Sequence, residues 1–497
     1  MSAPPLTAAP IPDDGRLDAE VLVVGSGAGG APTAALLAEA GFAVLIVEEG
    51  ALVHQGEVVP FSLAQMDRQY RNGGVTAAIG LPSIAYTEGS CVGGGTEINS
   101  GLYRRAPEQL LERWRTEHGL VDFDPLALDD IGTEIERDLS VQTVPGEQIP
   151  ASEALRRGAV GLGWRHDESP RWMTYPEGGA ARTGRRQSMT ETYLPRAQRA
   201  GARLVTGLRV DRLILDRGRA FRVEATRAHQ RELGPVTIDI DHVVVAAGAI
   251  QTPALLQRSG LRFNIGRRLA VHPTVKLAAR FPDVLNVSDD VPVHQVKEFA
   301  PDLSFGGSAS NPGLVALALS DSWDRFGPAV TDWERMAVYY AAITSEGRGR
   351  VRAIPGFRDP VVTYRLTARD RAVLGRGLSR LARLLLEAGA TDVFPSYRDA
   401  PVVRTPADLA HVAGSFALSR ASVMTVHLCS TVPFGEVATS AADSFGLVRG
   451  TANVRVNDAS LLPDAPGVNP QATVMAVAVR NARQFVATHT PGRRSIA

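Results

Sequence analysis

Residues 20–50 decide the fold of this chain, and they read EVLVVGSGAGGAPTAALLAEAGFAVLIVEEG. The apolar run at residues 21–24 predicts a strand that is buried on both faces, as a parallel strand must be. A glycine-rich turn and an alanine-rich helix come next, and a second apolar run at residues 44–47 predicts a second strand. This succession is a β-α-β unit, which predicts an α/β fold with a Rossmann-type parallel sheet.

The glycines of this unit have the G-x-G-x-x-G spacing, at Gly25, Gly27 and Gly30. The first permits a tight turn, the second lets the backbone approach a pyrophosphate, and the third lets the helix pack closely on the strand. Glu48 follows the second strand 23 positions after the first glycine, close to the spacing of about 20 at which an acidic side chain accepts hydrogen bonds from a ribose. We therefore expect a dinucleotide site. The alternative is a turn that only packs helix on strand, with Glu48 on the surface.

Length and composition limit the remaining possibilities. At 497 residues the chain is too long for a single core, so we expect two closely joined domains. The formal net charge is zero, which removes the electrostatic case for binding nucleic acid or an anionic membrane. No apolar run reaches the roughly 18 residues of a membrane span, and the N-terminus lacks the regions of a signal peptide. Only Cys91 and Cys429 are present, so we expect no disulfide framework and a cytoplasmic location.

Three later stretches carry further signals. Residues 89–107, GSCVGGGTEINSGLYRRAP, contain three consecutive glycines that let the main chain lie against a flat or phosphorylated group, or else form a flexible hinge. Residues 241–260, DHVVVAAGAIQTPALLQRSG, repeat the order of strand, small-residue turn and helix, which predicts another parallel strand of the same sheet. Residues 281–419 have alternating patterns that predict an antiparallel sheet with one covered face, interrupted by an amphipathic helix at residues 369–389.

The C-terminal stretch predicts a strand ending in Asp458 and then a buried, alanine-rich helix. Asn469 and Pro470 mark the start of that helix, with Asn469 as its N-cap and Pro470 at the first helical position. An asparagine before proline is usually only a cap, but a cap also exposes its amide at the helix end, so a second role stays open for Asn469.

Four motifs, in this order along the chain, resemble those of the glucose–methanol–choline (GMC) oxidoreductases, a family of FAD-dependent enzymes that oxidise alcohols. The motifs are GSGAGG with Glu48, GGGTEINSG, HVVVAAGAIQTPALLQRSG, and HLCST together with DASLLPDAPGVNPQATVMA. The loop RTGRRQSMTETYLPRA looks most like the branch that contains long-chain alcohol oxidases and bacterial cholesterol-oxidase-like enzymes.

The resemblance implies a fold that is α/β in class and α+β overall. We expect a Rossmann-type FAD-binding domain with a parallel sheet, and a substrate-binding domain with an antiparallel sheet and helices. The expected divisions are a flexible leader at residues 1–18, an FAD-binding domain at 19–107, 200–275 and 426–497, and a substrate-binding domain at 108–199 and 276–425.

Carried over position by position, the resemblance implies FAD contacts along much of the chain. The residues implied are Gly25, Gly27, Ala28, Gly29, Gly30, Glu48, Gly93, Gly94, Asn99, Val210, Ala247, Gly248, Asp458, Ala459 and Pro470. Val210 matches a position whose backbone contacts adenine. Family members with histidyl-linked FAD have a histidine immediately before the residue that Asn99 matches. Ile98 stands there in this chain, so non-covalent FAD is implied.

His427 matches the family's active-site histidine in an H-x-x-G-T motif, in which Ser430 replaces the usual glycine. Asn469 matches the second catalytic position, which is His or Asn. A neutral imidazole, with a usual pKa of about 6.5, suits removal of a hydroxyl proton. We expect His427 to accept or orient that proton while hydride passes to flavin N5, and Asn469 to fix the same oxygen. Roles for His272 and Cys429 stay open, and the ten histidines show no ligand spacing, so no metal is expected.

The expected reaction oxidises a moderately apolar or ring alcohol to an aldehyde or ketone. The acceptor of the electrons is oxygen, a quinone or a protein carrier, and neither that choice nor the oligomeric state follows from the sequence. Three alternatives remain. An NAD(P)-dependent reductase would leave the C-terminal motifs unexplained, a flavin-dependent lyase or decarboxylase would use the same scaffold, and a non-catalytic flavoprotein would bind the same cofactor.

Overall fold

The first layer of the fold is the sheet that contains the β-α-β unit. The computed structural model describes residues 6–229 and 231–492. The sheet has the strand order β10-β11-β12-β1-β2-β9, with β23 paired to β12. Its strands are β1 (Arg16–Val24), β2 (Val44–Val47), β9 (Arg203–Val205), β10 (Leu208–Asp216), β11 (Arg219–Arg227), β12 (Pro235–Val245) and β23 (Val454–Val456). Parallel pairing of β9, β2, β1, β12 and β23 confirms the prediction, and the hairpin β10–β11 extends the sheet in the antiparallel sense.

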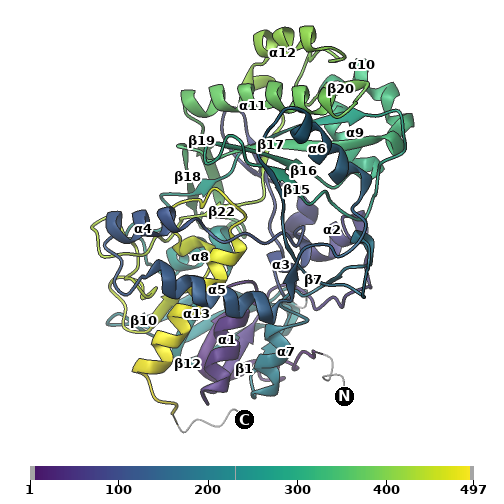
Figure 1. Cartoon of the computed structure of the whole chain (residues 1–497). Coiled ribbons are helices and arrows are strands. Elements are labelled where there is room, and N and C mark those ends of the chain that lie inside the picture. The colour runs from purple at the N-terminus through teal and green to yellow at the C-terminus, as the bar shows by residue number, and fades with distance from the viewer. Residues whose placement is uncertain (1–5, 230, 493–497) are drawn as a thin grey trace.

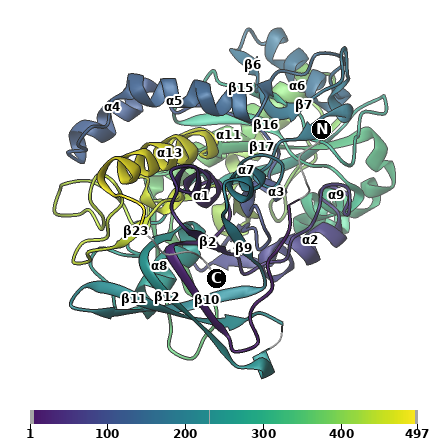
Figure 2. The same ribbon diagram turned by 90° about the horizontal axis from the view of Figure 1, so that it is seen from below.

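Helix α1 (Gly30–Glu39) connects β1 to β2 and lies between two other helices over the sheet. Figure 2 shows α13 (Gln471–Thr488) and α7 (Tyr193–Arg199) on either side of it. Ala31, Ala34 and Ala35 of α1 are fully buried, and their small side chains let the neighbouring helices approach. Helix α8 (Gly248–Arg258) follows β12, as the second strand–turn–helix pattern predicted.

The second layer is a nine-stranded sheet with the strand order β3-β4-β21-β14-β17-β16-β15-β6, and with β20 paired to β14. Its strands are β3 (Thr76–Ala78), β4 (Ile84–Tyr86), β6 (His166–Glu168), β14 (Thr274–Arg280), β15 (His294–Val296), β16 (Leu303–Gly307), β17 (Met336–Ile343), β20 (Asp392–Pro395) and β21 (Val423–Thr425). All pairs are antiparallel except β4 with β21. The predicted antiparallel sheet is therefore confirmed.

One face of this second sheet is covered by helices. Helix α11 (Ala368–Glu387), the predicted amphipathic helix, brings Gly377 against Leu303 of β16 and Ala341 of β17. Helix α6 (Pro150–Gly161) covers the same face, because the Tyr339 hydroxyl of β17 donates to Ala151 O. Figure 1 shows these helices around the second sheet, on the side of the molecule away from α1. The opposite face of the sheet turns towards the first layer.

The remaining elements are short sheets and peripheral helices. The strands are β5 (Val141–Gln142), β7 (Arg171–Thr174), β8 (Arg185–Arg186), β13 (Ala270–Val271), β18 (Arg348–Arg352), β19 (Val361–Arg365) and β22 (Leu428–Cys429). The helices are α2 (Leu63–Gln69), α3 (Gly95–Ile98), α4 (Glu108–Glu117), α5 (Pro125–Asp138), α9 (Pro312–Leu319), α10 (Trp323–Phe326) and α12 (Leu409–Ser415). None of the helices in the described ranges has the length and apolarity of a membrane span.

Packing differs from the expected divisions in three places. Residues 1–5 of the expected leader lie outside the described residues, but beyond them Leu6 is buried, Ala9 N–H donates to Leu204 O, and β1 already begins at Arg16. Helices α4 and α5 contribute Trp114 and Ile135 to the core of the first layer rather than the second. Strands β3 and β4, expected in the first domain, belong to the second sheet.

Candidate active site

A cavity of about 530 Å³ lies between the two layers and collects most of the predicted site. Its lining includes the predicted residues Gly25, Gly27, Ala28, Gly29, Glu48, Gly94, Asn99, Val210, Ala247, Gly248, Asp458, Ala459 and Pro470, together with His427 and Asn469. The carboxyl ends of β1, β2 and β12 reach this cavity, which is where parallel sheets bind ligands. Residues more than 400 positions apart therefore share one space.

Gly30 and Gly93, the other two predicted contacts, do not line the cavity. A Cβ at Gly30 would come within 2.0 Å of Gly25 O, so this glycine serves the close packing of α1 on β1. Gly93 has a φ of +87°, and a Cβ there would meet the Glu97 carboxylate at 2.2 Å. Both positions need glycine for reasons within the chain, and their contact with a cofactor stays a prediction.

Gly27 and Gly95 show the opposite situation. A Cβ at Gly27 would meet nothing nearer than Gly93 O at 3.8 Å, and a Cβ at Gly95 would meet nothing within 4 Å. Both glycines line the cavity. Packing of the chain does not require glycine at these positions, whereas a group that lies against the bare backbone does. The bare backbone at Gly27 and Gly95, called the glycine cradle below, therefore fits the pyrophosphate of a dinucleotide such as FAD.

Glu48 is buried at the end of β2 and is already partly engaged. Its carboxylate accepts hydrogen bonds from Ser26 N, Ser26 Oγ and Gly50 N at 3.1, 2.7 and 3.0 Å. Burial raises the pKa of Glu48, and these donors oppose that rise. A carboxylate has about four lone-pair sites, so capacity for a ribose hydroxyl remains. Ser26 Oγ also accepts from Gly93 N at 3.0 Å and so joins the two glycine-rich turns.

A cluster of charged side chains lines the nucleotide side of the cavity and was missed by the sequence analysis. Arg71 donates to Glu49 at 2.8 Å and lies 3.8 Å from Glu88. Burial raises the pKa of Glu88 to about 7. Arg209 and Arg258 line the same region. Arg71 begins a short 3-10 helix, Arg209 lies in β10 and Arg258 ends α8, so only folding brings their charges together.

Two histidines lie in contact on the other side of the cavity. His427, just before β22, places its Nδ1 2.9 Å from Nδ1 of His272, which follows β13. The backbone N–H of Gly467 donates to Nε2 of His272 at 2.9 Å. Nδ2 of Asn469 lies 3.5 Å from Nε2 of His427. The structure thus brings His272, left open by the sequence, into direct contact with the predicted catalytic residue.

The backbone of Gly467 determines which tautomer this pair adopts. Since Nε2 of His272 accepts a hydrogen bond from Gly467, the proton of neutral His272 must be on Nδ1 and must point at His427. Nδ1 of His427 then accepts, and the proton of neutral His427 lies on Nε2, facing the cavity. The resting pair consequently presents a donor to a ligand, and the amide oxygen of Asn469 suits the same Nε2–H after rotation of its side chain.

Burial keeps both imidazoles neutral. Burial and, to a smaller extent, the positive charge of Lys297 together lower the pKa of His427 to about 4. The pKa of His272 is lowered well below its usual value by burial, by His427 and by Lys297. Cys429 is buried, does not line the cavity, and has a raised thiol pKa because of burial, so it is not a nucleophile here.

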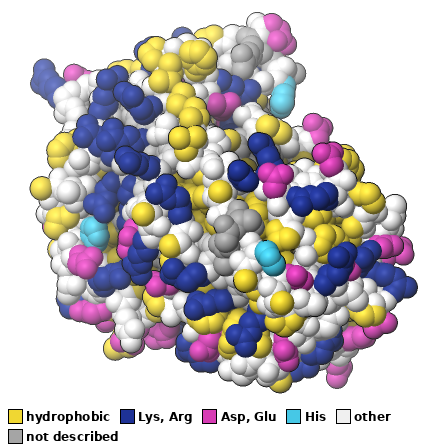
Figure 3. Space-filling model, turned by 90° about the horizontal axis from the view of Figure 1, so that it is seen from above, with side chains coloured by type: hydrophobic (Ala, Val, Ile, Leu, Met, Phe, Trp, Pro, Cys, Tyr) yellow, Lys and Arg dark blue, Asp and Glu magenta, His cyan; other side chains and the backbone are white. Residues whose placement is uncertain are grey.

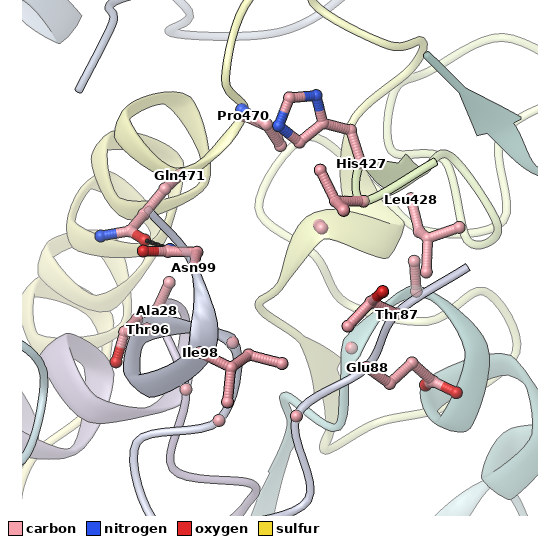
Figure 4. A pocket seen from close by; sticks show the side chains of 18 of the residues that line it. Ala28, Thr87, Glu88, Thr96, Ile98, Asn99, His427, Leu428, Pro470 and Gln471 are labelled. Carbon is pink, nitrogen blue, oxygen red and sulfur yellow. Dashed lines mark hydrogen bonds between the residues drawn. The ribbon is translucent and has the colours of Figure 1, made fainter. Parts of the chain in front are cut away.

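The start of α13 differs from the prediction. The helix begins at Gln471 and Pro470 is the N-cap residue, so Asn469 precedes the helix and does not cap it. Its side chain lies against His427 instead. Figure 4 shows His427 beside Pro470, and Asn99 joined to Gln471 by a hydrogen bond of 2.7 Å. The shift of one residue frees the Asn469 amide for the site.

Ser430, the departure from the H-x-x-G-T motif, keeps the backbone conformation that glycine would adopt. Its φ is +75°, in the left-handed region. Its hydroxyl donates to Pro463 O, and the residue is fully buried. The loop that carries His427 therefore has a left-handed residue at the position of the motif's usual glycine.

Comparisons with known proteins identify relatives of the chain. The sequence profile of the GMC oxidoreductases matches residues 66–274 with its N-terminal part and residues 345–478 with its C-terminal part. The chain is 38% identical over 474 residues to an uncharacterised GMC-type oxidoreductase of Sinorhizobium fredii, and the match covers 94% of each chain. It is 26% identical to a long-chain-alcohol oxidase of Arabidopsis thaliana, over 96% of this chain and 69% of that protein.

Two solved structures share the architecture. Pyridoxine 4-oxidase from Mesorbium loti has a TM-score of 0.68 at 19% identity, covering 95% of this chain and 100% of that one. A formate oxidase variant from Aspergillus oryzae, studied for FAD modification, has a TM-score of 0.72 at 15% identity, covering 95% and 99%. At these identities the likeness establishes the fold alone.

Proposed function

The chain belongs to the GMC oxidoreductase family, and from that premise we propose that it oxidises an alcohol to an aldehyde or ketone with non-covalently bound FAD. As a member of the family it is an oxidoreductase acting on CH–OH groups. The observation that carries the finer proposal is that one cavity holds both a glycine cradle and the His427–Asn469 pair.

FAD, when bound, supplies the acceptor for the hydride of the alcohol carbon at its flavin N5. Gly27, Gly94 and Gly95 would hold its pyrophosphate, and Glu48 its ribose. Ile98 lines the cavity where histidyl-linked members carry histidine, and its side chain has no nucleophilic atom for a covalent link. This supports non-covalent binding. Cys91 and Cys429 are free and buried, which fits a cytoplasmic enzyme.

His427 and Asn469 would hold the alcohol oxygen. In the resting tautomer Nε2–H of His427 donates to that oxygen, which also suits a carbonyl product. To accept the hydroxyl proton at Nε2, His427 must carry its own proton on Nδ1. The proton of His272 then lies on Nε2 and faces the N–H of Gly467. The buried hydrogen bond between these two groups is lost, at a cost of about 1–3 kcal/mol. We propose that in the substrate complex the proton on Nδ1 of His272 passes to Nδ1 of His427, that the proton on Nε2 of His427 passes through water to Nε2 of His272, and that His427 then acts as the base.

The alcohol itself is proposed to be moderately apolar or cyclic. Apolar side chains that line the cavity include Phe61, Met66, Leu314, Met424 and Val426. They can cover a hydrocarbon body while His427 and Asn469 hold its hydroxyl. For the electrons we propose oxygen, a quinone or a protein carrier as the acceptor, to be distinguished by assay.

The decisive experiment mixes the purified protein with a panel of alcohols without oxygen and follows flavin absorbance. We expect at least one alcohol to bleach the flavin, and acid precipitation to release the flavin from the protein. Persistent colour with every alcohol would favour a flavin-dependent lyase or a non-catalytic flavoprotein. Protein without flavin would contradict the cofactor assignment itself.

The variant His427→Asn tests the base. We expect flavin reduction to slow by at least about 10²-fold, the low end for loss of a general base, with FAD still bound. His54→Asn, the same substitution at an exposed histidine that does not line the cavity, serves as the matched control. Unchanged reduction in His427→Asn would refute the role.

A further inference from the structure

The cavity contains two ammonium groups that no step of the proposed reaction uses. Of the 53 basic residues in the printed sequence besides histidine, only Lys276 and Lys297 are lysines, and all others are arginines. Both lysines line the cavity of His427. The basic side chains that recur over the face shown in Figure 3 therefore belong to a surface that relies on arginine. This chain places lysine at two positions in 497, and both are in the site.

Strand register places the two lysines on the same face of the second sheet. Lys276 of β14 pairs with Tyr340 of β17, which pairs in turn with Gly306 of β16. Val296 of β15 pairs with Phe305, on the opposite face, so Lys297 shares the face of Gly306. Because side chains alternate along a strand, this face is the one opposite to α11 and α6. Other polar residues of the face that line the cavity are Thr274, Gln295, Ser304, Ser308 and Tyr340.

Neither ammonium group has a carboxylate partner among the described residues. Lys276 donates to Ser308 Oγ at 3.2 Å. Asp167 acts on Lys297 electrostatically, but its carboxylate is already paired with Arg104 at 2.6 Å. Arg71, a cation on the nucleotide side, is by contrast surrounded by Glu49, Glu88 and Asp359.

The acidic residues that line the cavity are engaged elsewhere. Asp458 accepts from Gly248 N, Thr252 Oγ1 and Ser460 N. Glu48 is held by Ser26 and Gly50, as described above. A buried ammonium without a counter-charge is unfavourable, and here burial lowers the pKa of both lysines to about 8. The groups remain mostly protonated at neutral pH, so an incoming anion would supply the missing charge.

We propose that the natural substrate is an alcohol that also carries an anionic group, a carboxylate or a phosphate, which binds between Lys276 and Lys297. This inference rests on the proposed function, because it names the substrate class of the same site. The apolar part of such a substrate would still lie against the apolar lining, and its charged end would lie at the two lysines.

Binding of such an anion also affects His427. The charge of Lys297 is one cause of the lowered pKa of His427, so an anion beside Lys297 reduces that effect and strengthens His427 as a proton acceptor. A substrate with the right anionic end would therefore both bind at the lysines and favour the base that acts on its hydroxyl.

The first test measures selectivity with matched alcohols. Without oxygen, 6-hydroxyhexanoate is compared with 1-hexanol, and 4-(hydroxymethyl)benzoate with benzyl alcohol. A third compound, 6-hydroxyhexyl phosphate, is compared with 1-hexanol and with 6-hydroxyhexanoate. We expect the anionic member to reduce the flavin with at least a tenfold higher kcat/KM, and the better of the carboxylate and phosphate identifies the group. Preference for the neutral member of every pair would overturn the inference, whereas failure of all these alcohols would count against the proposed function.

Variants connect the preference to the lysines. We expect Lys276→Met and Lys297→Met each to lower the ratio of kcat/KM for the anionic over the neutral alcohol at least tenfold, mainly through KM. Lys276→Arg and Lys297→Arg should restore most of that ratio. An unchanged ratio, with only the reaction with oxygen slowed, would instead assign the lysines to the electron acceptor and overturn the inference.

A binding measurement tests the anion site without requiring that any alcohol is oxidised. Because lysine occurs twice, reductive methylation of the holoenzyme with ¹³C-formaldehyde labels two side chains besides the α-amino group. We expect hexanoate or hexyl phosphate to protect Lys276 and Lys297 from labelling, as read by peptide mass spectrometry, and hexanol to leave them reactive. Equal labelling with and without the anions would refute an anion site even if alcohol oxidation is confirmed.

Discussion

Single residues decide which protons the site can handle. The tautomer of His427 is selected by a backbone N–H three contacts away from any substrate, through the ring of His272. Position 272 needs a side chain that accepts from Gly467 and donates to His427, because only such a side chain places the proton of His427 on Nε2. The loop that holds Gly467 thus determines, through two histidine rings, which nitrogen of His427 carries the proton.

The pH dependence of the reaction is the first prediction at this scale. The pKa of His427 is lowered to about 4, and a base acts only when neutral, so its active form is present above that pH. We expect kcat/KM for a neutral alcohol to rise as the pH passes about 4 and to stay level through 6.5, where an unperturbed histidine titrates. The groups facing His427 do not interfere, since His272 stays neutral and Lys297 stays cationic over this range.

Anaerobic flavin reduction at a series of pH values provides this measurement. Nitrogen-15 NMR of the histidine rings, which distinguishes the tautomers, should place the resting proton of His427 on Nε2. A titration limb near 6.5, absent in His427→Asn, would contradict the assigned pKa shift.

Ser430 supplies a prediction about stability. Its left-handed backbone costs a residue with a Cβ about 1–2 kcal/mol, and its buried hydroxyl satisfies Pro463 O. Ser430→Ala keeps the strain and loses the hydrogen bond, for a loss of about 1–3 kcal/mol in the free energy of unfolding. Ser430→Gly loses the same bond but removes the strain. Thermal unfolding should therefore rank wild type above Ser430→Gly, and Ser430→Gly above Ser430→Ala; the reverse order of the two variants would refute the strain.

At the scale of elements, the turn between β1 and α1 combines two uses of glycine. Gly25 lets the turn approach Ala246 after β12 and Gly30 lets the helix approach Gly25, whereas Gly27 leaves backbone bare towards the cavity. The same motif thus contains positions where packing requires glycine and a position where it does not.

Alanine substitutions separate these uses. A Cβ at Gly27 fits the chain, so we expect Gly27→Ala to keep its secondary structure while its affinity for FAD falls at least about tenfold, equivalent to about 1.4 kcal/mol. In Gly30→Ala the Cβ overlaps Gly25 O, so the apoprotein itself should unfold at lower temperature. Flavin titration followed by fluorescence and thermal unfolding of the apoprotein measure the two effects. A destabilised apoprotein in Gly27→Ala would show that this glycine is structural too.

At the scale of the whole molecule, the site exists only between the two sheets. The ends of the parallel strands provide the cradle, and the polar face of the second sheet closes the cavity above it. A dinucleotide in this space would contact both layers, so its binding and their association should be linked.

This linkage predicts that FAD stabilises the fold. A ligand that binds only the folded chain adds about 2.7 kcal/mol at a hundredfold excess over its Kd. We expect the unfolding temperature of apoprotein to rise with added FAD and to stay unchanged with riboflavin, which lacks the ADP half that Gly27 and Glu48 would hold. No rise with FAD would contradict the cradle.

Local patterns were enough to predict a large part of the architecture. The β-α-β unit, the parallel strand β12 with α8, the antiparallel second sheet and α11 all follow from periodicity, because side-chain alternation and helix periodicity are properties of consecutive residues. The resemblance added His427, Asn469 and the predicted cofactor contacts, most of which line the cavity.

Other features depend on which faces the folded chain brings together, and no local pattern contains them. The path of the chain alone places His272 against His427, Arg71 among carboxylates, and α5 on the first core rather than the second. Composition did hold one unused signal, the restriction of lysine to Lys276 and Lys297. Only the tertiary structure shows that the two ammonium groups lie in the site without a carboxylate partner among the described residues. Their surroundings come from strands that are far apart in the sequence.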